Sequence, residues 1–165
     1  MSERTRVSGL TLVLGGARSG KSRIAEELAG DDVVYVATAE VTDDDFAARV
    51  ARHRDRRPAS WSTVESDADL VATIRSLPPR SALVDSLGTW VARCEGFAAD
   101  GASLAGALAA RRAPTVVVSE EVGLGVHPPT DVGRRWRDAL GEVNQEVAAV
   151  AHRVLLVVAG RTLEL

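Results

Sequence analysis

Residues 15–22 read Gly-Gly-Ala-Arg-Ser-Gly-Lys-Ser and match the phosphate-binding pattern G-x-x-x-x-G-K-[ST] at every fixed position. In such a loop successive backbone N–H groups surround a phosphate, and glycine permits the backbone angles that this curl needs. Lys21 is expected to reach the β- and γ-phosphates, while the Ser22 hydroxyl binds the Mg²⁺ that bridges phosphate oxygens. The residues predicted to bind nucleotide here are Gly15, Gly16, Ala17, Arg18, Ser19, Gly20, Lys21 and Ser22.

The residues on either side of this loop support a nucleotide site. The apolar run 10–14 before it predicts a buried strand, and residues 23–28 after it predict a helix whose positive end faces the phosphates. The alternative is a glycine-rich turn that binds nothing. Because the strand and the helix flank the loop as the motif requires, the sequence favours a nucleoside triphosphate ligand.

A histidine surrounded by arginines forms a second candidate site in residues 49–58. Thr42 and the three aspartates after it predict a helix start, Pro58 predicts its end, and His53 continues an apolar stripe along the helix. A solvated basic helix with an incidental histidine is one interpretation. In the other, the arginines neutralise phosphate oxygens and keep the imidazole neutral, so that His53 attacks the α-phosphorus, expels pyrophosphate and carries the nucleotide.

Acidic residues follow two further predicted strands. Asp85 comes after the apolar run 82–84, and Glu120 and Glu121 come after the run 115–118. An acid at the carboxyl end of a parallel strand can bind Mg²⁺ or a ribose hydroxyl. Asp85 as a helix N-cap is the alternative. The sequence leaves open which of these acids serves the metal.

Short apolar runs alternate with helical periodicity along the chain. The runs at 10–14, 33–37, 82–84, 115–118 and 154–158 predict buried parallel strands. Apolar residues at helical spacing from Val132 through Trp136 to Val150 predict a long helix behind a cap at Asp131, and 96–112 predicts a loop followed by a helix. We therefore expect an α/β, P-loop NTPase-like, three-layer domain with a mostly parallel sheet, formed by residues 1–165 as a single catalytic domain.

Composition limits the possible functions. The 165 residues carry a net charge of −3 with a pI near 5.6, which argues against nucleic acid as the main partner. No apolar run is long enough to span a membrane and no signal peptide is evident, so we expect a cytoplasmic protein. The lone Cys94 is expected in the core, His127 in a surface loop, and His152 near a helix end as a dipole-compensating residue. Core packing is expected for Trp136.

Several segments contain motifs that are specific in combination. They are 15–22, 35–39, 48–58 with Trp61 beyond it, 120–125, 143–145 and 156–160. With its phosphate-binding loop, His-Arg-x-Arg-Arg-Pro and Glu-Val-Gly-Leu-Gly in that order, the chain resembles a known enzyme family, the bifunctional adenosylcobinamide kinases and adenosylcobinamide-phosphate guanylyltransferases of cobalamin assembly. The resemblance covers nearly the whole chain.

The resemblance implies two reactions, phosphorylation of adenosylcobinamide and transfer of GMP from GTP to the product, with Mg²⁺ and ATP or GTP as phosphate donor. It implies that His53 is the guanylylated residue, that Lys21 is catalytic, and that the subunits form a trimer. Asp85 would contact the guanosine. The other residues that the resemblance places near the nucleotide are Ala37, Thr38, Ala39, Arg54, Asp55, Arg56, Arg57 and Glu65.

Two positions differ from the usual family pattern. Ser86 follows Asp85 where cysteine is usual, and Glu120 stands where asparagine is common, which adds a negative charge near the expected site. Two other functions remain open on the residues alone. One is a small-metabolite kinase in which His53 forms no covalent adduct, and the other is a nucleotide-dependent regulatory module that recruits a protein partner.

Overall fold

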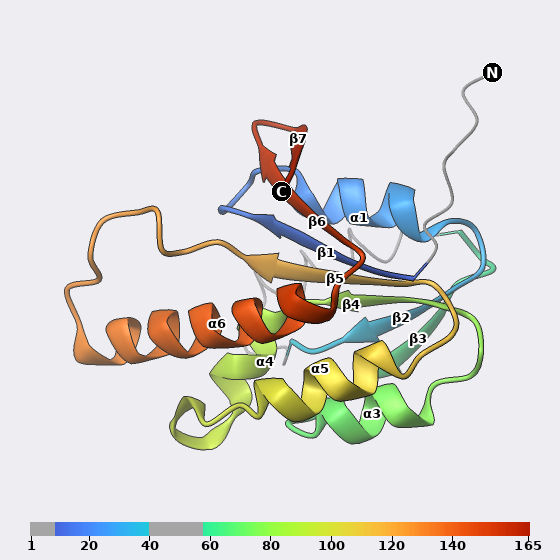
Figure 1. The fold of residues 1–165 in the computed structure, drawn as a ribbon, viewed down its shortest axis with the longest axis horizontal. Helices are drawn as coiled ribbons and strands as arrows, with labels where there is room; N and C mark the ends of the chain where they lie inside the picture. Colours follow the sequence, from blue (N-terminus) through green and yellow to red (C-terminus); the bar gives the residue numbers. More distant parts are fainter. Residues whose placement is uncertain (1–8, 40–57) are drawn as a thin grey trace.

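A computed structural model describes residues 9–39 and 58–165 of the chain. Seven strands form one sheet in the order β3-β2-β4-β5-β1-β6-β7, and every neighbouring pair is parallel except β6 and β7 (Figure 1). The strands are β1 (Leu10–Gly15), β2 (Val33–Ala37), β3 (Ser62–Glu65), β4 (Ser81–Asp85), β5 (Thr115–Glu120), β6 (Arg153–Val158) and β7 (Arg161–Glu164). The mostly parallel α/β sheet predicted from the sequence is confirmed.

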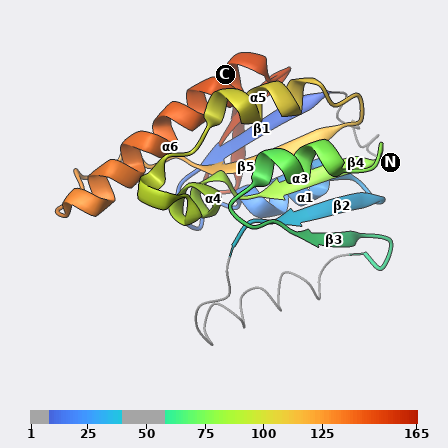
Figure 2. The same cartoon turned by 90° about the horizontal axis from the view of Figure 1, so that it is seen from below.

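Helices cover both faces of this sheet. Helix α1 (Lys21–Ala29) lies on one face, and the other four α-helices within residues 9–39 and 58–165 lie on the opposite face (Figures 1 and 2). Each face has its own apolar cluster, because alternate residues of every strand point to opposite sides. The four helices are α3 (Leu70–Ser76), α4 (Leu87–Arg93), α5 (Gly101–Ala109) and α6 (Asp131–Val150). The result is the expected three-layer arrangement.

The five strands predicted from apolar runs are all present, and two strands were missed. Strand β3 reads Ser-Thr-Val-Glu and β7 reads Arg-Thr-Leu-Glu, and both lie at the edges of the sheet with largely exposed side chains. An edge strand with exposed faces needs no continuous apolar run, so periodicity gives little signal. Helices α3 and α4 were missed as well, since seven residues are too few for a clear helical stripe.

Helix α6 begins one residue away from its predicted cap. Thr130 is the N-cap, because its Oγ1 accepts a hydrogen bond from Gly133 N at 3.1 Å, and Asp131 is the first helical residue. Val132 is 61% exposed, so its predicted place on the buried stripe is wrong. The first turns of α6 extend past the ends of the strands, where no sheet lies beneath them (Figure 1). Leu140 is completely buried further along the helix.

The predicted helix within 96–112 is present as α5, which follows a 3₁₀ turn at Glu95–Phe97. Asp100 caps α5 by accepting a hydrogen bond from Ser103 N at 2.9 Å. At Gly101 an added Cβ would lie 3.3 Å from Val143 of α6, so glycine permits the close approach of the two helices. Among the described residues, no helix is long and apolar enough to cross a membrane.

Two histidines and the cysteine can be compared with their predictions. His127 lies in an exposed loop as expected and forms a 3.0 Å hydrogen bond with Arg137. His152 lies near the end of α6 as expected, but its role differs from the predicted one, because its Nδ1 accepts a hydrogen bond from Leu10 N at 3.1 Å and so secures the start of β1. Cys94 packs against the core, and burial raises the pKa of its thiol.

Candidate active site

The phosphate-binding loop joins the end of β1 to the start of α1, as the motif requires. Arg18 and Gly20 have φ values of 56° and 94°, so the chain turns through the left-handed region twice within the loop. A hydrogen bond of 2.7 Å from Gly160 N to Ser19 O ties the loop to the turn after β6. The backbone of the phosphate-binding loop is therefore curled at the carboxyl ends of β1 and β6.

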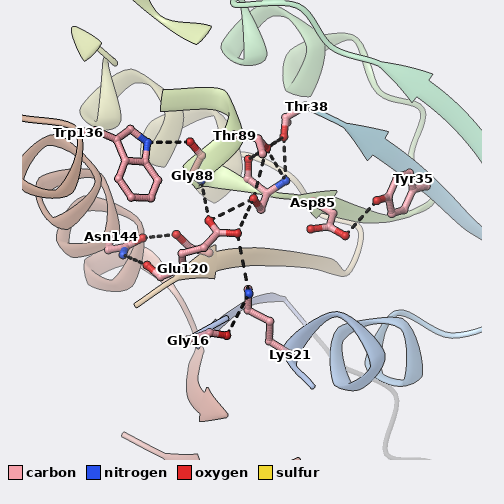
Figure 3. Close-up of polar contacts among 12 residues, drawn as sticks. Gly16, Lys21, Tyr35, Thr38, Asp85, Gly88, Thr89, Glu120, Trp136 and Asn144 are labelled. Atoms are coloured by element: carbon pink, nitrogen blue, oxygen red, sulfur yellow. Dashed lines mark hydrogen bonds and ion pairs between the residues drawn. The ribbon is translucent and has the colours of Figure 1, made fainter. Parts of the chain in front are cut away.

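Lys21 lies over this loop with 12% of its side chain exposed. Its Nζ donates a hydrogen bond to Gly16 O at 3.3 Å and lies 3.9 Å from Glu120 Oε1 (Figure 3). An ammonium group in this position can form an ion pair with a phosphate bound in the loop. Ser22 is the second residue of α1, so its hydroxyl lies in the first turn beside the loop.

Glu120 ends β5 next to the loop, and its carboxylate is held by helix α4. Its Oε1 accepts a hydrogen bond from Ser86 Oγ at 2.9 Å, and its Oε2 accepts one from Gly88 N at 3.0 Å. Burial raises the pKa of Glu120 above its usual range, although Lys21 and the Ser86 hydroxyl lower it. Asp85 adds a further negative charge nearby that also raises this pKa. The acid expected beside the loop is therefore present, and its carboxyl group faces Lys21.

Glu121 has a different environment from Glu120. Its carboxylate accepts a hydrogen bond from Gly123 N at 2.7 Å within the following loop, and its backbone N donates to Gly15 O at 3.1 Å. Of the two adjacent glutamates, Glu120 is the one whose carboxyl group lies beside Lys21 of the phosphate-binding loop.

Asp85 ends β4, two strands away from the phosphate-binding loop. Its Oδ2 accepts a hydrogen bond from the hydroxyl of Tyr35 at 3.0 Å, and the Tyr35 ring stacks on Trp61 with centroids 6.5 Å apart. Ser86 is the N-cap residue of α4, so the alternative in which Asp85 caps that helix is wrong. Asp85 is instead an acid at a strand end that a buried tyrosine orients.

Thr38 lies just after β2 and is completely buried. Its Oγ1 donates to Ser86 O at 2.7 Å, lies 2.6 Å from Thr89 Oγ1, and accepts from Ser86 N at 2.8 Å. Its backbone O accepts from Arg93 Nη1 at 3.1 Å. The hydroxyl and the backbone oxygen of Thr38 thus already have hydrogen-bond partners within the protein. We therefore expect Thr38 to hold the site in position, while a ligand contacts the neighbouring residues.

The sheet register aligns the predicted nucleotide-binding residues along one edge. Gly15 pairs with Glu120, and Ala37 pairs with Asp85 on one side and with Glu65 on the other. Five neighbouring strands, in the order β3, β2, β4, β5 and β1, therefore end in a row beside the loop. Ala39 follows two residues after β2. The predicted residues His53, Arg54, Asp55, Arg56 and Arg57 lie outside the described residues.

Some residues of this site had no role assigned from the sequence. The Arg93 guanidinium donates from Nη1 to Ser66 O at 2.6 Å as well as to Thr38 O, and so joins the ends of β2 and β3. Trp136 packs against the core as predicted, and its Nε1 also donates to Gly88 O at 3.0 Å, which secures α4 (Figure 3). No motif in the sequence points to Arg93. Ser86, which binds Glu120, was noted in the sequence only because it follows Asp85 where cysteine is usual.

Comparisons with solved structures agree with the fold. The P4 protein from bacteriophage phi6 in complex with ADP superposes with a TM-score of 0.51 and 19% identity, over 96% of this chain and 55% of that one. A KaiC-like protein, PH0186 from Pyrococcus horikoshii OT3, gives a TM-score of 0.54 and 15% identity, over 90% and 70% of the two chains. At these identities the likeness concerns the fold alone, and it confirms the P-loop NTPase-like architecture.

Comparisons of sequence give the family. The bifunctional adenosylcobalamin biosynthesis protein CobU of Salmonella typhimurium is 39% identical over 92% of this chain and 96% of its own length. CobP of Pseudomonas aeruginosa, described in the same words, is 41% identical over 90% and 92%. The family model for cobinamide kinase / cobinamide phosphate guanyltransferase matches residues 11–165. The chain therefore belongs to the cobinamide kinase / cobinamide phosphate guanyltransferase family.

Proposed function

We propose that this chain phosphorylates adenosylcobinamide and then transfers GMP from GTP to the resulting phosphate, which gives adenosylcobinamide-GDP. Family membership supports both activities. The observation that carries the proposal is the row of strand ends from Gly15 through Glu120, Asp85 and Ala37 to Glu65, because it offers one continuous edge beside a phosphate-binding loop. In open α/β sheets, ligands bind outside the carboxyl ends of the strands.

In the kinase step the loop holds the phosphates of the donor nucleotide. The N–H groups at the start of α1 and the Lys21 ammonium stabilise negative charge on the β- and γ-phosphates as the substrate alcohol attacks in line. The O–P bond to the alcohol forms while the bond from the γ-phosphorus to the bridging oxygen breaks. Either ATP or GTP fits this description, because a loop of this kind binds the phosphates, which the two nucleotides share.

The oxygen atoms at the loop fit Mg²⁺. Ser22 supplies a hydroxyl in the first turn of α1, and Glu120 and Asp85 supply carboxylates at the ends of neighbouring strands. Hydroxyl and carboxylate oxygens are the ligands that this ion prefers. Ser22 is the residue we propose as its direct ligand, and the ion would neutralise charge on the phosphate oxygens.

In the guanylyl transfer step we propose that the His53 imidazole attacks the α-phosphorus of GTP, with pyrophosphate as the leaving group. The phosphate of the corrinoid substrate then displaces the histidine. Arg54, Arg56 and Arg57 are proposed to stabilise the charge on the oxygens during both displacements. Asp85, oriented by Tyr35, is proposed to contact the guanosine.

Labelled nucleotides test the two steps separately. With adenosylcobinamide and Mg²⁺, label at the γ-phosphate of ATP or GTP is expected to appear on the corrinoid, and label at the α-phosphate of GTP is expected to follow it. Transfer of the γ-label without the α-label would leave a plain kinase, and transfer of neither label would contradict the proposal. The trimer, the single domain over residues 1–165 and the cytoplasmic location remain predictions.

A further inference from the structure

The Lys21–Glu120 ion pair lies beside the loop that is expected to hold the nucleotide phosphates. In the structure the Lys21 ammonium contacts only protein acceptors among the described residues, Gly16 O at 3.3 Å and Glu120 Oε1 at 3.9 Å (Figure 3). A bound nucleotide must draw the ammonium toward its β- and γ-phosphates. Nucleotide binding therefore removes the cation that now faces the Glu120 carboxylate.

Glu120 is not free to move away with its partner. Ser86 Oγ and Gly88 N hold its two carboxylate oxygens, and an added Cβ at Gly88 would overlap the carboxylate, so it lies directly against α4. The backbone of Glu120 is fixed as well, because its O accepts a hydrogen bond from Asn144 Nδ2 at 3.2 Å. Its side chain is 25% exposed, so water screens this charge only partly.

A fixed carboxylate beside bound phosphates has an electrostatic cost. Like charges separated by a few ångströms in a partly buried site repel strongly, and a buried charge that loses its partner is destabilised further. The cost grows with the charge of the nucleotide, so a triphosphate is affected more than a diphosphate. Asp85 lies close enough to influence the ionisation of Glu120 and adds negative charge to the same edge.

We propose that Glu120 is a specificity-determining residue of the phosphate-binding loop. Its anchored negative charge opposes the γ-phosphate, so the loop distinguishes triphosphate from diphosphate poorly until a divalent cation on the nucleotide offsets that charge. The inference rests on the proposed function only in that the loop binds a nucleotide, and it requires neither transfer reaction.

Calorimetric titration tests this inference with β,γ-imido-ATP and ADP, each with Mg²⁺ and with EDTA. Every variant carries His53→Ala so that no covalent adduct forms, and Lys21→Ala identifies the binding that belongs to the loop. Without Mg²⁺, Glu120→Gln is expected to bind the triphosphate analogue roughly tenfold more tightly or better, because one full charge is removed from the site. The gain is expected to be smaller for ADP and to shrink when Mg²⁺ is present.

Glu121→Gln is the matched control, since the Glu121 carboxylate accepts a hydrogen bond from Gly123 N within the following loop. It is expected to leave all four affinities unchanged. Glu120→Asn is a second uncharged variant, expected to change binding in the same direction, and an unfolding midpoint close to that of the parent chain shows that each variant is folded.

Unchanged or weaker binding of the triphosphate analogue by both uncharged variants would overturn the inference, and would show that Glu120 orients Lys21 for the phosphate. Loss of all binding of the analogue in both variants would also overturn the inference. The outcome is separable from the proposed function. If Glu120→Gln binds the triphosphate analogue more tightly but no label is transferred to the corrinoid, only the proposed function is contradicted. If label is transferred but the affinity does not increase, only this inference is contradicted.

Discussion

The two halves of the strand edge differ in how they are prepared for a ligand. At β1 and β5 the polar groups are charged, and Lys21 and Glu120 face each other at 3.9 Å. At β2 and β4 the network centred on Thr38 consists of hydroxyls and backbone atoms, and Asp85 and Arg93 are held at its margin by Tyr35 and by backbone oxygens. A charged pair must rearrange when phosphates arrive, whereas a satisfied hydroxyl network keeps its geometry. The loop half is therefore the part that responds to the ligand, and the β2–β4 half is the rigid part that positions it.

The largest effect is expected at the responsive half. Lys21→Ala removes the ammonium that stabilises charge on the transferring phosphate, so we expect the rate of γ-phosphate transfer to adenosylcobinamide to fall by about 10²-fold or more. Initial rates with γ-labelled nucleotide measure this. Arg23→Ala, which loses only the exposed Arg23–Glu27 pair on α1, is the control and is expected to retain the rate. Equal rates for Lys21→Ala and the parent chain would show that the phosphate-binding loop does not act in the kinase step.

The rigid half is expected to show its importance in stability. Thr38→Val keeps the shape of the side chain but removes the hydrogen bonds between the Thr38 hydroxyl and Ser86 and Thr89. The Ser86 N–H then keeps only its longer contact with Thr89 Oγ1 at 3.3 Å, and we expect a cost of about 1–3 kcal/mol in the free energy of unfolding. Urea denaturation measures this cost. Thr63→Val on the exposed strand β3 is expected to change stability little. A Thr38 variant as stable as the Thr63 variant would show that the network does not hold this half together.

A smaller effect is expected where the rigid half meets the nucleotide. Tyr35→Phe removes the hydroxyl that orients Asp85 and leaves the stacking on Trp61 in place. The KM for GTP in GMP transfer is expected to rise by about threefold to tenfold, the value of one hydrogen bond, with little change in kcat. If instead kcat falls while KM stays constant, Tyr35 acts on the reacting groups and does not orient a binding residue.

The smallest effect concerns pH and returns to the loop half. Burial raises the pKa of Glu120 in the folded chain above its ordinary value of 4.5. The folded state therefore takes up this proton more readily than the unfolded state, so the contribution of Glu120 to stability is complete below pH 4.5 and is lost as the pH rises through the folded pKa. Relative to Glu120→Gln, the parent chain is expected to lose stability over that range. A difference between the two chains that does not change with pH would show that the pKa of Glu120 is not raised.

The sequence was most informative where chemistry is local. The phosphate-binding loop and the strand before it were predictable, because glycine, lysine and serine at fixed spacing act within eight consecutive residues. Asp85 and Glu120 were recognisable as acids at strand ends, since each follows a buried apolar run. Which way each acid points was not predictable, because the answer depends on α4, a seven-residue helix without a periodic signal.

Contacts between distant segments were also beyond the sequence. Tyr35 meets Asp85 across 50 positions, and Arg93 meets Thr38 across 55, through the order of the strands in the sheet. The exposed edge strands β3 and β7 carry too few apolar residues to be recognised. The exposure of Val132 was missed for a similar reason, since a helical stripe does not reveal where the supporting sheet ends.

The intact mass of the chain after incubation with GTP and Mg²⁺ tests the central claim most directly. The claim is that this family member forms a covalent GMP adduct on His53. The chain is compared with His53→Ala and denatured without acid, because phosphoramidates are acid-labile. An added GMP on the parent chain alone is the predicted result. If GTP binds and the mass of the parent chain does not change, the covalent mechanism is wrong and His53 is left with a role in phosphate binding alone.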